Sequence, residues 1–469
     1  MLRGMEDRFR IAFVSGKLGD VDGVSLEVDK WVEVLSSMGH EVFTVAGKYA
    51  RPVAGVPAER QYLLDRIRFD SPQQQHYERL AFPHLNRRPP HLNQDSLEMM
   101  MDQLESDGKE VADILREYIQ DNEIDVLVAE NTNAMPMSLV GGMAMYRLAT
   151  ENRMATIFHH HDFWWERSRF SNNNIERLLN RIMPPVDPGL EHVVISSYAS
   201  HILSSLKRVQ PHIIPNCEDF EHPVTLDDYN RTFREDMGFG PDDVLVVQPT
   251  RIVPRKRIED SVALLGRFVE RYPAFRDRIR YIVSLYQGDE SEERYIDDIR
   301  AAAARAGVPL HLIADRVASS RGTDEQGQKI YTNRDVLANA DLVTYLPIWE
   351  GFGNALLEAV AARVPVVTTT YLVYKTDIMT SGLYNVEIRD RYDDRGDIII
   401  PEDALDEIHY LLTHPEERRE RVEHNFERGR AEFSLPRLAD RLSHVLTEYA
   451  DEIRASRRRL RKTRMRYSV

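Results

Sequence analysis

The sequence predicts an α/β protein built from two doubly wound parallel-sheet domains, and two observations carry this prediction. Short, almost continuous apolar runs alternate with amphipathic helical segments, which is the pattern of parallel strands buried on both faces by helices. The alternation begins at residue 10, is interrupted over residues 60–122, and starts afresh near residue 244. The chain of 469 residues is also long for a single domain, because one domain typically takes about 150 residues.

The first domain opens as a β-α-β unit. RIAFVSG is its first strand, the next segment carries apolar residues at helical spacing and stops at Gly39, and EVFTVAG is its second strand. Residues 60–122 are polar and then helical, so we expect a mostly helical insertion there. Further strands are expected at IDVLVAE, MATIFHH and EHVVISS. We place this domain at residues 1–238, ending in a polar stretch with glycine and proline that suits a linker.

A second series of strands and helices predicts a second domain over residues 239–436. Its expected strands are VLVVQPT, YIVSLY, LHLIAD, DLVTYL and VPVVTTT, and its helices include RIEDSVALLGRFVERYP, RYIDDIRAAAARAG and NALLEAVAAR. Residues 437–469 are expected to form a C-terminal helix that packs back towards the first domain, followed by a basic tail. Two such domains are expected to face each other across a cleft, with the ligand at the carboxyl ends of the strands.

Composition excludes several classes of protein. The formal net charge of −15 argues against nucleic acid as a partner. There is no apolar run of membrane-spanning length and no signal-peptide core near the start, so we expect a cytoplasmic protein. The single cysteine, Cys217, excludes an intrachain disulfide and a cysteine-ligated zinc site.

The basic run RASRRRLRKTRMR is expected to be a solvated helix end, with contact to anionic lipid or an acidic partner as the alternative. The oligomeric state is left open, a homo-oligomer included.

The segment DLVTYLPIWEGFGNALLEAVAAR carries the most chemical information. A strand leads to Glu350, glycines at 351 and 353 allow backbone amides to approach a ligand, and a helix is expected to start near Asn354. Glu358 then lies about one turn inside that helix. A helix N-terminus after a strand binds anions such as a diphosphate, and two carboxylates can accept hydrogen bonds from sugar hydroxyls. The alternative is a capped helix with one solvated glutamate.

EGFGNALLE, with seven residues between Glu350 and Glu358, resembles the EX7E signature of glycosyltransferase family 4. PTRIVPRKRIEDSVAL carries Arg251 and Lys256 at the spacing of that family's basic motif. HVVISSYASHIL, IIPNCEDF and FERGRAEFSLPRLADRL resemble further family segments in the same order. The resemblance covers nearly the whole chain except residues 60–122 and the basic tail. It implies the GT-B fold of two Rossmann-like domains and transfer with retention of anomeric configuration.

The resemblance also implies roles for individual residues. Arg251 and Lys256 would bind the donor diphosphate and stabilise the leaving group, Glu358 would bind ribose, and Glu350 would lie beside the hexose. The implied donor site consists of Gly23, Arg251, Lys256, Glu350, Phe352, Gly353, Asn354 and Glu358. Preorganised cations suit this chemistry, because breaking a glycosyl–phosphate bond leaves negative charge on the diphosphate. Outside this context, Arg255 and Lys256 would be taken for an exposed helix start.

The segment FHHHDFWWERSRF follows a strand of the first domain. By resemblance, His161 lies near the transferred sugar and acts with Glu350, Arg251 and Lys256 in catalysis. His160, Asp162 and Trp164 are assigned to the acceptor, with packing roles as the alternative for the histidines and for Trp164. Consecutive strand residues point to opposite faces, so the three histidines make a poor metal-ligand set. No acidic cluster is assigned as a DxD metal site, because clusters such as Asp393-Asp394 lie in polar loop sequence. The resemblance implies transfer without a metal.

The sequence therefore predicts a retaining glycosyltransferase that moves a hexose from a UDP- or GDP-sugar to a hydroxyl of a small soluble acceptor, without a further cofactor. A sugar phosphorylase or a nucleotide-sugar epimerase of the same fold, and a non-catalytic nucleotide-sugar binding protein, are the alternatives. The loop YLVYKTDIM departs from the family pattern, so Tyr371, Tyr374 and Lys375 are candidates for a subfamily-specific substrate contact.

Overall fold

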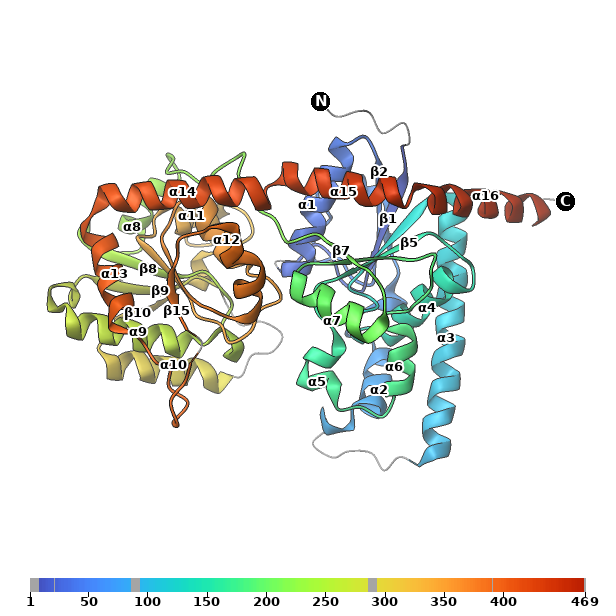
Figure 1. Cartoon of the computed structure of the whole chain (residues 1–469), viewed down its shortest axis with the longest axis horizontal. Coiled ribbons are helices and arrows are strands. Elements are labelled where there is room, and N and C mark those ends of the chain that lie inside the picture. Colours follow the sequence, from blue (N-terminus) through green and yellow to red (C-terminus); the bar gives the residue numbers. More distant parts are fainter. Residues whose placement is uncertain (1–7, 21, 86–92, 286–292, 390, 468–469) are drawn as a thin grey trace. The chain divides into compact units, whose positions relative to one another are not determined.

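The computed structural model describes residues 8–20, 22–85, 93–285, 293–389 and 391–467, the backbone alone for 293 and 461–467. The chain divides into two compact units, drawn in Figure 1: unit 1 is Met1–Pro215 with Pro436–Val469, and unit 2 is Asn216–Leu435. Residues 216–238, which the sequence analysis assigned to the first domain, thus have their contacts in unit 2. Each unit is a parallel α/β sheet with helices, so the predicted fold class is confirmed.

Unit 1 contains a seven-stranded sheet in the order β3-β2-β1-β4-β5-β6-β7, and every adjacent pair of strands is parallel. The strands are β1 Arg10–Ser15, β2 Glu41–Ala46, β3 Gln61–Leu63, β4 Val126–Glu130, β5 Thr156–His160, β6 Glu191–Val194 and β7 His212–Ile213. β1 and β4 are neighbours although they are far apart in sequence. The strand order therefore reverses between them, and ligands of doubly wound sheets bind outside the carboxyl ends at such a point.

Helices connect and flank the strands of unit 1. They are α1 Gly23–Ser37, α2 Pro72–Ala81, α3 Gln94–Asp121, α4 Leu139–Thr150, α5 Ser168–Ser171, α6 Glu176–Ile182, α7 Ser197–Lys207, α15 Leu435–Glu448 and α16 Ala450–Tyr467. In α1, Val28, Trp31 and Leu35 are buried at helical spacing, and Gly39 follows the helix with φ of +88°, a conformation that favours glycine. The insertion consists of α2 and α3 but also includes the short edge strand β3, which the sequence pattern did not indicate.

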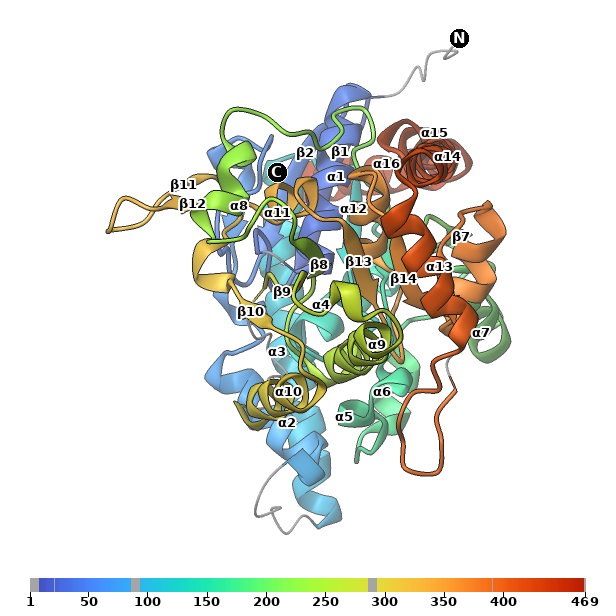
Figure 2. The same ribbon diagram turned by 90° about the vertical axis from the view of Figure 1, so that its left-hand side faces the viewer.

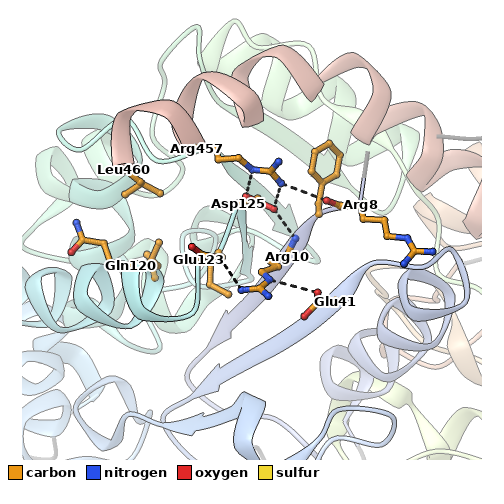
Figure 3. Close-up of a pocket in the computed structure, with 11 residues that line it drawn as sticks. Arg8, Arg10, Glu41, Gln120, Glu123, Asp125, Arg457 and Leu460 are labelled. Carbon is orange, nitrogen blue, oxygen red and sulfur yellow. Dashed lines mark hydrogen bonds and ion pairs between the residues drawn. The ribbon is translucent and has the colours of Figure 1, made fainter. Parts of the chain in front are cut away.

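The last helix, α16, is fastened to the amino ends of the strands of unit 1 (Figure 3). Arg457 forms a two-nitrogen ion pair with Asp125, and the same carboxylate accepts a hydrogen bond of 2.9 Å from the backbone N–H of Arg10. Arg10 in turn reaches Glu123 and Glu41. These residues line a pocket of about 220 Å³. It lies at the opposite edge of the sheet from the carboxyl ends, where doubly wound sheets bind ligands.

Unit 2 contains a six-stranded parallel sheet in the order β10-β9-β8-β13-β14-β15, together with a small antiparallel pair, β11 and β12. The strands are β8 Val244–Gln248, β9 Ile279–Val283, β10 Leu310–Leu312, β11 Gly322–Thr323, β12 Lys329–Ile330, β13 Leu342–Tyr345, β14 Val366–Thr369 and β15 Val386–Ile388. The helices are α8 Phe233–Asp236, α9 Ile258–Arg271, α10 Glu293–Ala306, α11 Asn333–Ala338, α12 Asn354–Ala361, α13 Glu402–Thr413 and α14 Pro415–Phe433. α9 and α10 lie side by side, as Figure 2 shows.

No helix in the described part of the chain is long and apolar enough to cross a membrane.

Candidate active site

A group of paired charges in unit 2 lies where two neighbouring strands end. β8 and β13 are adjacent in the sheet, and the chain leaving β8 forms a short 3₁₀ turn, Pro254–Lys256, while the chain leaving β13 carries Glu350. The Arg255 guanidinium donates a hydrogen bond of 2.7 Å to Glu350 Oε1, and the Lys256 ammonium forms an ion pair with the same oxygen. Lys256 also lies over the ring of Tyr345, 5.3 Å from its centroid. Arg255 and Lys256 are therefore not an exposed helix start.

Burial makes the charges of this group strongly interdependent. Glu350 is 8% exposed. Burial alone would raise the pKa of the Glu350 carboxyl, but the positive charges of Arg255 and Lys256 hold it at about 2. Burial lowers the pKa of Lys256 to about 8, and the positive charges of Arg255 and Arg251 act in the same direction against the effect of Glu350. At neutral pH the group carries one carboxylate and an excess of positive charge, which suits a diphosphate.

Arg251 is the third cation at this edge. It is half-buried, and it forms no ion pair with any residue in the part of the chain that the structure describes. Its charge is close enough to Lys256 to lower the pKa of that ammonium. A guanidinium with this freedom can bind phosphate oxygens through two parallel N–H bonds.

The glycine-rich turn before α12 is shaped by a buried tyrosine. Gly353 has φ of +142°, and a Cβ at this position would lie 2.4 Å from Oη of Tyr371. That hydroxyl donates a hydrogen bond of 2.6 Å to the carbonyl of Phe352. Tyr374 is also buried and donates to Glu387 at 2.7 Å. Tyr371 therefore lies directly against the turn, and of the three residues singled out in this loop only Lys375 is exposed.

The start of α12 holds two more of the predicted residues. Asn354 Oδ1 accepts a hydrogen bond of 2.6 Å from the Asn216 amide. Glu358, one turn further on, accepts a hydrogen bond of 2.8 Å from Asn333, whose own oxygen accepts one of 2.7 Å from Ser284. Glu358 is thus oriented by a fixed network and is not a freely solvated carboxylate. The sequence analysis missed Asn333 and Ser284 in this role, because nothing local distinguishes them.

In unit 1, a buried carboxylate joins two of the three consecutive histidines. β4 and β5 pair so that Glu130 lies opposite His159. Glu130 Oε2 lies 2.9 Å from His159 Nδ1, and Oε1 lies 2.7 Å from His161 Nε2. The Trp31 ring stacks on His159 at 4.3 Å between centroids, and the His161 backbone N–H donates to Asn131 Oδ1 at 3.1 Å. His161 is therefore held from both its backbone and its ring.

Glu130 also controls the charge of this group. Burial would raise the pKa of Glu130, but the hydrogen bonds and charges of His159 and His161 lower it. Burial lowers the pKa of His159. For His161, burial acts in the same direction, but the hydrogen bond that the ring donates to Glu130 and the negative charges nearby together raise its pKa. The ring nitrogen of His161 that lies next to Glu130 is Nε2, so Nδ1 takes no part in this pairing.

The remaining residues assigned to the acceptor have partners inside unit 1. His160 faces the opposite side of the strand, is buried, and lies 3.0 Å from His192 through Nε2. Asp162 is paired with Arg167. Trp164 is 5% exposed, and its Nε1 donates to the Met183 carbonyl at 2.9 Å. For His160 and Trp164 the structure thus favours packing over acceptor binding.

Gly23 opens α1 but does not leave the helix N-terminus empty. The Asp22 carboxylate accepts hydrogen bonds of 3.1 and 2.9 Å from the amides of Val24 and Ser25, and Lys17 lies 3.3 Å from Asp22. A carboxylate already occupies the position that a phosphate would take. A donor contact at Gly23 would therefore require Asp22 to move.

Two groups of side chains among the described residues bring at least three metal-ligating atoms within 4.8 Å of one another. One is Glu130, His159 and His161, where hydrogen bonds between the carboxylate and both rings account for the arrangement. The other is His212, His444 and Glu448, on the surface of unit 1.

Similarity to proteins of known activity identifies the family, although no family model matches the chain. The mannosylglucosylglycerate synthase of Thermotoga maritima is 33% identical over 449 residues, which covers 92% of this chain and 99% of that protein. The chain belongs to the mannosylglucosylglycerate synthase family. A second member, from Petrotoga mobilis, is 29% identical over 427 residues, which covers 87% of this chain and 94% of that protein.

This member of the mannosylglucosylglycerate synthase family is a glycosyltransferase with the GT-B fold. Among solved structures, Anabaena HepE in complex with UDP and glucose superimposes with a TM-score of 0.61 at 14% identity, covering 94% of this chain and 100% of that chain. At this identity the similarity concerns the fold. The predicted class of enzyme, a transferase that uses nucleotide sugars, agrees with these findings.

Proposed function

We propose that the chain is a retaining mannosyltransferase of glycosyltransferase family 4 that transfers mannose from a nucleoside diphosphate mannose to a hydroxyl of glucosylglycerate. The relatives at 33% and 29% identity are mannosylglucosylglycerate synthases. Their product carries mannose outside glucose and glycerate, so a single glycosyl transfer that completes it joins mannose to glucosylglycerate. This substrate is small and polar, which agrees with the acceptor class expected from the sequence.

The observation that carries the proposal is the pairing of the buried Glu350 with Arg255 and Lys256 beside the N-terminus of α12. A leaving nucleoside diphosphate needs preorganised positive charge, and this group offers it. We assign the diphosphate to Arg251, Lys256 and Arg255, and to the amides at Phe352–Asn354. Glu358, already oriented by Asn333, is assigned to the ribose hydroxyls.

No side chain of this group is free to act as a nucleophile, because Glu350 is bound to two cations. We therefore propose that the acceptor hydroxyl attacks on the face from which the diphosphate leaves, and that a phosphate oxygen takes the acceptor proton. The anomeric configuration is then retained. Glu350 holds Arg255 and Lys256 in position, and no metal takes part. His161, oriented by Glu130, is assigned to the transferred sugar.

Thermal unfolding in the presence of nucleotides tests the donor assignment. GDP, UDP, ADP and inorganic phosphate are compared on the wild type and on Lys256→Ala. A ligand at 100 times its dissociation constant adds about 2.7 kcal/mol to the free energy of unfolding. We expect one nucleoside diphosphate to stabilise the wild type and to lose most of this effect in the variant. Stabilisation by phosphate alone would indicate a phosphorylase instead, and no stabilisation by any of them would contradict the site.

The donor should bind less well above about pH 8. Lys256 has a pKa of about 8, so its ammonium is charged below this pH and loses its proton above it. Because kcat/KM reports the free enzyme, kcat/KM for the donor is expected to fall by roughly tenfold per pH unit on the alkaline side. Lys256→Arg keeps its charge, so its profile should stay flat to about pH 10. A wild-type profile that is also flat to that pH would exclude Lys256 from diphosphate binding.

A further inference from the structure

Four side chains that can bind a transition metal lie together on unit 1, and none of them belongs to the active site proposed above. His212 comes from the edge strand β7, Glu191 from the neighbouring strand β6, and His444 and Glu448 from the last turns of α15. His212 Nε2 lies 3.2 Å from Glu191 Oε2 and 3.7 Å from Glu448 Oε2. His444 Nε2 lies 3.4 Å from Glu448 Oε1.

These separations match those between the ligands of one tetrahedral ion. Zinc binds imidazole nitrogen and carboxylate oxygen at ~2.0–2.2 Å, so two ligand atoms on the same ion lie about 3.3 Å apart. The ring planes of His212 and His444 are nearly perpendicular, at 86°, with centroids 5.8 Å apart, so the rings approach without stacking on each other. Two imidazoles with carboxylates are a donor set for zinc and its neighbours in the first transition row.

The backbone brings these residues together before any ion binds. His444 and Glu448 are four residues apart and therefore share one face of α15. The residue after Glu448, Tyr449, is buried, and its hydroxyl accepts a hydrogen bond of 3.0 Å from the Thr156 amide and donates one of 2.8 Å to the Gly189 carbonyl. His212 is the strand partner of Val193, which lies on the same face of β6 as Glu191. Little reorganisation is needed for the donors to converge.

We propose that His212, His444 and Glu448 bind one divalent transition-metal ion, zinc in the first place, with Glu191 as a fourth donor. The ion joins β6 and β7 to a helix more than 200 residues away in the sequence. Its role is structural: it fastens α15 to the edge of the sheet of unit 1. The proposal does not depend on the proposed transfer reaction, because metal binding is measured without substrates.

The test uses the full chain, freed of metal with a chelator that is then removed. Zinc binding is measured by calorimetry and by thermal unfolding, and cobalt serves as the spectroscopic probe, since a tetrahedral nitrogen–oxygen site gives intense visible absorption. His444→Ala removes an exposed ligand and should leave the unfolding temperature of the metal-free protein unchanged. The matched control is His222→Ala, an exposed histidine 3.0 Å from Asp219 that belongs to no group of three ligands within the described residues.

The wild type and His222→Ala are expected to bind one zinc ion with a raised unfolding temperature and a tetrahedral cobalt spectrum. His444→Ala should lose the spectrum and weaken zinc binding by at least about tenfold, since even the loss of a group that only orients a ligand has an effect of this size. Zinc binding in His444→Ala equal to the wild type would place the ion elsewhere and overturn the proposal. An absence of any stabilisation of the wild type by zinc would overturn it as well.

Discussion

Glu350→Gln is expected to lower kcat by about 10²- to 10³-fold, the loss typical when one preorganised electrostatic group is removed from an active site. Glutamine keeps the shape of the side chain but carries no charge. Arg255 and Lys256, which both bind Glu350 Oε1, would then repel each other without a counter-charge between them. The cations that we assign to the leaving diphosphate would lose their geometry, so the effect should appear in kcat more than in the KM of the acceptor.

Steady-state kinetics with saturating nucleoside diphosphate mannose measures this effect, and Glu423→Gln is the matched control. Glu423 also pairs with an arginine, Arg363, at 2.7 Å, but on the surface of unit 2. Its loss should change kcat by less than about twofold, since exposed ion pairs contribute little. Removal of one partner from a buried pair can also cost about 3–5 kcal/mol in stability, so unfolding of both variants is recorded. A folded Glu350→Gln protein with nearly wild-type kcat would refute the role of Glu350.

Glu130→Gln is expected to lower kcat by about 10²-fold with little change in the KM of the donor. The Glu130 carboxylate binds both His159 and His161 and raises the pKa of His161. Without that charge, burial dominates and the pKa of His161 falls. Any limb of the pH–rate profile that reports His161 should therefore move to lower pH in the variant, a change that a merely structural role of Glu130 would not produce.

The control for Glu130→Gln is a substitution at the other end of β4. Asp125 directly precedes β4, is buried, and pairs with Arg457 at the amino edge of the sheet (Figure 3). Asp125→Asn should lower the unfolding temperature, because a buried ion pair is broken, while kcat and the pH–rate profile stay as in the wild type. Equal losses of kcat in the two variants would mean that Glu130 acts through the stability of unit 1, and unchanged kcat in Glu130→Gln would exclude it from the mechanism.

Much of the fold follows from local patterns in the sequence. Buried parallel strands such as VLVVQ and DLVTY are apolar along their whole length, which sets them apart from half-buried strands. The helix start near Asn354 was predicted, and Gly353 is required before it by its backbone conformation and by the closeness of Tyr371. The short strand β3 and the transfer of residues 216–238 to unit 2 were missed, because both depend on tertiary contacts that no local pattern shows.

In the candidate site, too, local patterns predicted individual residues, whereas the contacts between them depend on the tertiary structure. Glu350, Lys256 and Glu358 were selected by spacing, but the pairing of Arg255 with Glu350 arises only because β8 and β13 are neighbours. Glu130 was missed although it ends a buried strand. Because side chains alternate along a strand, His160 points away from His161, and His159 and His161 lie on the same face. A carboxylate at the end of one strand, followed by His-X-His at the end of the next, was the available signal. The group around His212 and His444 could not be predicted from the sequence, because only the packing of α15 brings His444 and Glu448 close to His212.

The central claim is retaining transfer of mannose to glucosylglycerate, and the anomeric configuration of the product tests it most directly. The enzyme is incubated with an α-linked nucleoside diphosphate mannose and glucosylglycerate, and the one-bond carbon–hydrogen coupling at the new anomeric carbon is measured by NMR. The account predicts an α-mannoside of glucosylglycerate. A β-mannoside would contradict the retaining mechanism, and the absence of any mannosylated product with either GDP- or UDP-mannose would contradict the assigned reaction.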